Sequence, residues 1–116
     1  MRRFGHYAVG IANGSIDMFS AFEDLGPMWT GEGSRLEARE VRFDESFVEP
    51  PVVQIGLSMW DIGVNGNQRV DIKAVNVTRE GFRAEFRTWG DTRVARVRAS
   101  WIAVGPVPHL DDFSDD

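Results

Sequence analysis

Apolar and polar residues alternate along much of this chain, which is typical of β-strands with one buried and one solvent-facing side. The pattern is clearest in segments 69–77, 81–89 and 93–104. In 81–89, two phenylalanines and an alanine alternate with two arginines and a glutamate. In 93–104, one face carries Ala95, Val97, Ala99, Trp101 and Ala103. These segments are predicted strands, and we expect Trp101 and Phe82 in the core.

Segments earlier in the chain show the same pattern less regularly. Segment 52–59 follows two prolines, which fit a strand entry because proline cannot donate inside a ladder. Segment 36–43 is a further candidate, whereas the apolar spacing in Ser15–Phe22 fits a strand or a helix equally. Glycine and asparagine turns separate the runs. About six short strands with short connections predict an antiparallel sandwich or barrel.

A chain of 116 residues that is 42% hydrophobic has room for one compact core. Four Trp and eight Phe supply large buried areas, and the absence of Cys excludes disulfides. We expect a single domain over 1–105, with the lead-in 1–14 left unassigned. Segment 106–116 contains two prolines and four aspartates, which predicts a mobile acidic tail.

The charge balance argues against several classes of partner. The net charge is −5, and the thirteen basic residues form neither a nucleic-acid footprint nor a polybasic membrane patch. No apolar run approaches the roughly 20 residues that span a bilayer. Arg2 and Arg3 have the charge of a signal peptide, but no apolar segment follows them. We therefore expect a soluble protein made in the cytoplasm, with release or association with a particle left open.

The sequence offers little material for catalysis. Its two histidines, His6 and His109, lie near the termini, and it has no cysteine for a thiol nucleophile. Carboxylates are numerous, but nothing marks one pair for glycoside hydrolysis. We expect no enzyme, no catalytic residues, no cofactor and no bound metal.

An aromatic side chain at a strand end suggests a different chemistry. A sugar ring has an apolar C–H face and a rim of hydroxyls, so it is bound by an aromatic surface, a forked donor and a carboxylate acceptor. Trp89 ends a predicted strand and is followed by Gly90 and Asp91. Its ring either covers the edge of the core or is exposed for contact with a sugar.

A series of short motifs between Phe43 and Gly105 supports the second alternative. They are Phe-x-x-x-Phe-x-x-Pro-Pro-x-Val from Phe43, Arg69-Val70, Asn76-Val77-Thr78, Gly81-Phe82, Thr88-Trp89-Gly90-Asp91-Thr92 and Ser100-Trp101-Ile102-Ala103. In this order they resemble the H-type lectin domain, the family of snail agglutinins and discoidin C-terminal domains. The resemblance implies a six-stranded antiparallel β-sandwich that forms trimers or hexamers. It also implies binding of N-acetylgalactosamine or galactose-like glycans at protomer junctions.

The resemblance also assigns roles to single residues. Arg69 matches the family arginine that bonds sugar hydroxyls, and Trp89 matches the tryptophan of the Thr-Trp-x-x-Thr motif. Gly90 stands where the snail agglutinin has a sugar-contacting histidine, so one donor is missing. Glu32 aligns with the family's acidic ligand, and Asp91 completes the set of predicted carbohydrate-binding residues. The alternative is that Arg69 pairs with Glu32 or Asp91 for a structural purpose.

Two functions follow. The first is an oligomeric lectin, and the second is a structural or attachment module of a phage-like or surface particle with a degenerate sugar site. The last predicted strand favours assembly through its outer face. We expect this face to mix charged and apolar residues, which is unusual for a surface that only meets solvent. The residues are Arg93, Val94, Arg96, Arg98 and Ile102.

Overall fold

A computed structural model describes residues 1–20 and 26–110 and contains six strands and one short helix in them. The elements in chain order are β1 (Ala8–Ser20), α2 (Pro27–Thr30), β2 (Arg35–Arg42), β3 (Val52–Ile62), β4 (Val70–Val75), β5 (Gly81–Thr88) and β6 (Val94–Val107). No helix of this part of the chain is long and apolar enough to cross a membrane. The predicted all-β fold is confirmed.

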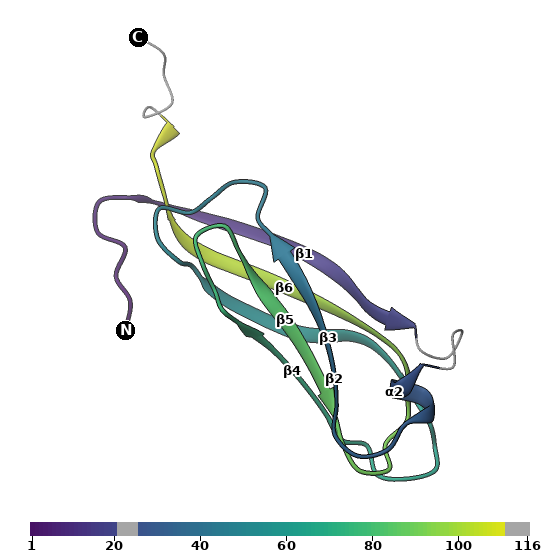
Figure 1. Cartoon of the computed structure of the whole chain (residues 1–116). Coiled ribbons are helices and arrows are strands. Elements are labelled where there is room, and N and C mark those ends of the chain that lie inside the picture. The colour runs from purple at the N-terminus through teal and green to yellow at the C-terminus, as the bar shows by residue number, and fades with distance from the viewer. Residues whose placement is uncertain (21–25, 111–116) are drawn as a thin grey trace.

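The strands form two antiparallel sheets of three strands each, with orders β1-β6-β3 and β2-β5-β4 (Figure 1). The central strands β5 and β6 have a neighbour on each side, and their inner positions are the most completely buried. They are also the strands with the clearest alternation in sequence. The architecture is the predicted six-stranded antiparallel β-sandwich.

Three strands are longer than the sequence predicted. β1 begins at Ala8, inside the unassigned lead-in, and continues to Ser20, so the helical interpretation of Ser15–Phe22 is wrong up to Ser20. Phe22 lies outside the described residues. β3 continues to Ile62, and β6 continues to Val107, past the expected strand end. β1 and β6 support each other, because Ala8 pairs with Val107 and the ladder then runs to Ser20. Residues 111–116 of the predicted tail also lie outside the described residues.

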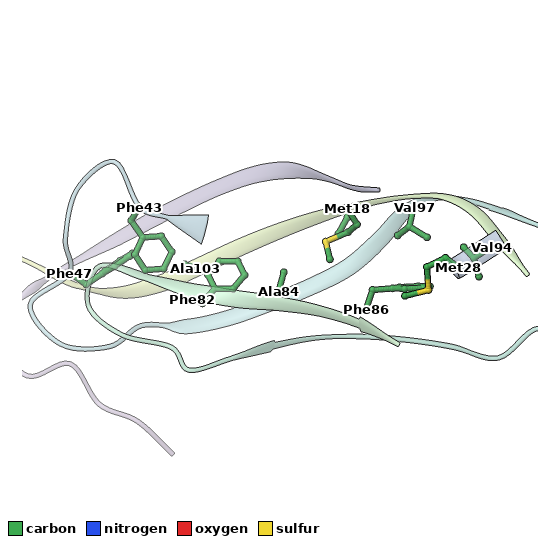
Figure 2. Close-up of a cluster of buried hydrophobic side chains, with 11 residues drawn as sticks. Met18, Met28, Phe43, Phe47, Phe82, Ala84, Phe86, Val94, Val97 and Ala103 are labelled. Atoms are coloured by element: carbon green, nitrogen blue, oxygen red, sulfur yellow. The ribbon is translucent and has the colours of Figure 1, made fainter. Parts of the chain in front are cut away.

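The core lies between the sheets and is rich in aromatic side chains (Figure 2). Phe43 packs edge-on against Phe47 at 5.1 Å between ring centroids, and Trp101 packs against Phe82 at 5.3 Å. Phe82 is buried as expected, whereas Trp101 is half-buried, with one side against this cluster. The expected core role of both residues is confirmed.

One residue of the predicted outer face of β6 lies inside. Val94 is fully buried, because β6 has one extra residue between the pair Asp61–Arg96 and the pair Ile62–Val94. Such a β-bulge shifts the alternation of a strand by one position. Val94 and Ala95 are therefore both buried, while Arg96 points to solvent.

Candidate functional site

The predicted site residues gather at one end of the sandwich. The segments there are 31–34 between α2 and β2, 63–69 between β3 and β4, and 89–93 between β5 and β6 (Figure 1). Arg69, Gly90 and Asp91 come together there, while Glu32 and Trp89 lie to either side, as described below.

Two buried threonines hold the backbone of Arg69 in place. The Thr88 hydroxyl donates to the Arg69 carbonyl at 2.6 Å. The Thr92 hydroxyl accepts from the Arg69 amide at 3.1 Å and donates to the Asn67 carbonyl. Both threonines are 1% exposed. The threonines of the Thr-Trp-Gly-Asp-Thr motif therefore fix segment 67–69, and the three residues between them are left at the surface.

The Arg69 side chain pairs with Asp91. Its Nη1 donates to the Asp91 carboxylate at 2.6 Å, and this hydrogen bond lowers the pKa of Asp91 below its ordinary value. Among the described residues, the Nε and Nη2 donors of Arg69 have no acceptor. Of the two ion pairs considered from sequence, the structure contains Arg69–Asp91 and not Arg69–Glu32.

Gly90 makes room for this guanidinium. Its φ is +69°, a conformation that favours glycine, and a Cβ there would lie 3.0 Å from Arg69 Nη1 and 3.3 Å from Cζ. The Gly90 carbonyl accepts hydrogen bonds from the Gly33 amide at 3.0 Å and from Arg35 Nη2 at 3.2 Å. The glycine at this position thus lets Arg69 lie against the turn.

Arg35 organises the same loops and was not singled out from sequence. Its guanidinium donates to five backbone carbonyls, those of Pro27, Met28, Gly33, Gly90 and Thr92. Burial, with the charge of Arg93 as a second cause, lowers the pKa of Arg35. No sequence pattern distinguishes this arginine from its neighbours, because all its acceptors are backbone atoms.

Glu32 and Trp89 do not reach Arg69. The Glu32 carboxylate is largely exposed and lies 3.9 Å from the Arg93 guanidinium. Trp89 is 43% exposed and lines a shallow hollow of about 250 Å³ beside Ser34, Arg35 and Arg87. The predicted site is therefore only partly assembled within one chain.

Asp91 lines a different hollow, of about 570 Å³. Trp29, Asn65 and Arg93 also line it, and they were not predicted as site residues. An indole, an amide, a carboxylate and a guanidinium together suit a ligand rich in hydroxyls. By contrast, the described residues contain no group of three or more His, Asp or Glu side chains that would hold a metal ion.

Comparison with known proteins agrees with the fold. The family model of the H-type lectin domain matches residues 38–104. A protein called ATP synthase subunits region ORF 7, from Fuscovulum blasticum, is 50% identical over 106 residues, which are 91% of this chain and 92% of that protein. Discoidin-2 from Dictyostelium discoideum is 37% identical over 76 residues, 65% of this chain and 30% of its own length.

Solved structures also match the fold of this chain. Two structures of discoidin II from Dictyostelium discoideum match with TM-scores of 0.68 and 0.70 at 30% identity. Each match covers 91% of this chain, and 40% and 39% of the discoidin chains respectively. This chain thus spans less than half of the discoidins that it matches. The matched residues include the turn that holds Arg69, and the chain belongs to the H-type lectin domain family.

Proposed function

We propose that this protein is a carbohydrate-binding module that recognises galactose- or N-acetylgalactosamine-like glycans through Arg69. The observation that carries the proposal is the way in which the fold holds the backbone and the side chain of this arginine. Its backbone is fixed by two buried threonines, and its side chain is oriented by Asp91. Its remaining donors have no acceptor in the part of the chain that the structure describes. A forked donor held in this way can bond two vicinal hydroxyls at once.

The other predicted residues complete the chemistry of a sugar site. Asp91 accepts hydrogen bonds from hydroxyls, and Trp89 offers an exposed ring for the apolar face of the sugar. In one chain, Trp89 and Asp91 line separate hollows. We propose that a neighbouring protomer completes each half of the site, so that the glycan binds at a junction between protomers.

The outer face of β1-β6-β3 is the surface that fits self-association. Four large apolar side chains are exposed on it: Val9, Ile11, Val52 and Ile102. Arg96 and Arg98 on the same face already pair with Asp61 and Asp17 within the chain. The outer face of β2-β5-β4 instead carries a row of charges, in which Glu85 bonds two arginines. We propose that the apolar face joins protomers into a trimer.

Light scattering tests this assembly. The wild-type chain is expected at about three times its 13.0 kDa mass, or a multiple of that. Ile11→Glu places a charge on the apolar face and should give a monomer. Val64→Glu is the matched control, since Val64 is 90% exposed and lies in the β3–β4 loop. A monomeric wild-type chain at micromolar concentration would refute the assembly.

A second candidate function is a structural or attachment module whose sugar site no longer binds. Two observations favour it: Nη1 of Arg69 is already engaged by Asp91, and Glu32 does not reach this arginine. A screen of the purified protein on immobilised glycans separates the two. Binding to terminal galactose or N-acetylgalactosamine supports the lectin, and binding to no glycan supports the attachment module.

A further inference from the structure

Another hollow lies at the opposite end of the sandwich from Arg69. Its volume is about 360 Å³, and it is bounded by the first half of β1, the end of β2, the loop that follows β2 and the end of β6. Arg42, Asp44, Glu45, Phe47 and Trp101 are among the residues that line it. This volume is within the usual range of ligand sites, about 300–1,000 Å³.

The side chains on the half-buried face of β1 change in size along the strand. Its half-buried positions carry Gly10, Ala12 and Gly14 in the first half, whereas Ile16 and Met18 fill the same face further on. Gly14 cannot carry a side chain without moving Trp101, since a Cβ there would lie 2.9 Å from three atoms of the indole. The Trp101 indole thus lies directly against Gly14, and the Val107 side chain lies in the same way against Gly10, so both side chains reach the wall of the hollow.

The polar groups around this space are unused by the fold. Among the described residues, the Trp101 Nε1–H has no hydrogen-bond acceptor. Arg42, Asp44 and Glu45 form no ion pair or side-chain hydrogen bond with any described residue. Most other arginines, Arg69 and Arg96 among them, are paired. The hollow thus combines an aromatic wall with a free forked donor and two free carboxylates.

We propose that this hollow is a second saccharide subsite, which takes one sugar unit. Sugar hydroxyls would donate to Asp44 and Glu45 and accept from Arg42 and the Trp101 indole N–H. The apolar face of the ring would lie against aromatic carbon. β2 leads from Arg35 in the first site to Arg42 here, and seven steps of about 3.3 Å separate the sites by roughly 23 Å. One protomer can therefore hold two glycans at its opposite ends.

Nuclear magnetic resonance of the four tryptophan indole N–H groups tests the proposal. The full chain is titrated with methyl glycosides of galactose, N-acetylgalactosamine, glucose, mannose and N-acetylglucosamine. The Trp101 signal, assigned by triple-resonance experiments, should shift with saturation for at least one of them. In the double variant Arg42→Gln/Asp44→Asn the affinity should fall about ten-fold to a hundred-fold, because charge-assisted hydrogen bonds are lost.

Matched variants separate this site from the first one. Lys73→Gln/Asp71→Asn removes a cation and a carboxylate from exposed positions of β4, where neither forms an ion pair with a described residue. This variant should leave the Trp101 response unchanged. Arg69→Ala should also keep that response, so failure of the Arg69 site does not affect this test. The proposal is overturned if no glycoside shifts the Trp101 signal, or if the Arg42→Gln/Asp44→Asn variant binds the glycoside with the affinity of the wild type.

Discussion

Thr92→Val is expected to destabilise the protein and to release Arg69. Valine is β-branched like threonine but has no hydroxyl, so it has nearly the same shape at this buried position while two hydrogen bonds are lost. The amide of the half-buried Arg69 then loses its acceptor, whereas the carbonyl of the exposed Asn67 can bond water instead. A backbone group left without a partner in a buried position costs about 1–3 kcal/mol. We expect the free energy of unfolding to fall by roughly 1–3 kcal/mol.

Urea unfolding followed by tryptophan fluorescence measures this loss. With a slope of about 1.5 kcal/mol per molar urea, a loss of 3 kcal/mol moves the midpoint by roughly 2 M. Protein concentration has to be equal in all samples, because self-association adds to the apparent stability. Ser46→Ala is the control, since Ser46 is exposed in the β2–β3 loop and should change stability by less than about 0.5 kcal/mol. A loss below about 0.5 kcal/mol for Thr92→Val would contradict the role given to this threonine.

Three further results are expected. Gly81→Ala should lower the melting temperature strongly, since its Cβ would lie 2.0 Å from the Val41 carbonyl oxygen. Gly63→Ala is the control and should not lower it, because its Cβ would make ordinary contacts at 3.5 Å. Equal melting temperatures of the two variants would count against the close approach at Gly81. The pKa of Asp91 is lowered by its hydrogen bond to Arg69. The pairing therefore stabilises the folded protein fully at pH values above the ordinary aspartate pKa, and this stabilisation is lost as the pH falls through the lowered pKa. A carboxyl titration by nuclear magnetic resonance should show this low midpoint, and Arg69→Ala should return it toward the ordinary value; an unchanged midpoint would show another cause. Glycan binding should survive a chelator, and its loss with EDTA and recovery with calcium would show that the site needs a metal.

The sequence predicted the central strands better than the edge strands, for a physical reason. β5 and β6 have a neighbour on both sides, and their inner positions must be apolar, so Phe82, Phe86 and Val97 alternate with charges. The first half of β1 is an edge with glycine and alanine on its half-buried positions, and its alternation is therefore weak. Val94 was placed outside because a one-residue bulge cannot be read from alternation alone.

The candidate site was predictable where it rests on a local motif. The motif Thr88–Thr92 and Arg69 lie 19 or more residues apart in sequence. The family resemblance predicted that they belong to one site, and the structure places them in contact. Arg35 and Trp29 were missed, because they act through contacts between loops that are distant in the chain. Glu32 was predicted as the acidic sugar ligand by counting back from Phe43 without an alignment gap. Its carboxylate lies beside Arg93 instead of Arg69.

Titration of the wild-type chain and of Arg69→Ala with a galactose- or N-acetylgalactosamine-terminated glycan tests the central proposal most directly. A hydrogen bond to a charged group contributes about 1.5–3 kcal/mol, so the variant should bind about ten-fold to a hundred-fold more weakly. Its mass by light scattering should equal that of the wild type, since the threonines hold the backbone of this residue and not its side chain. Glycan binding that is unchanged in Arg69→Ala, or an assembly that falls apart in this variant, would contradict the account and show that the arginine has a structural role.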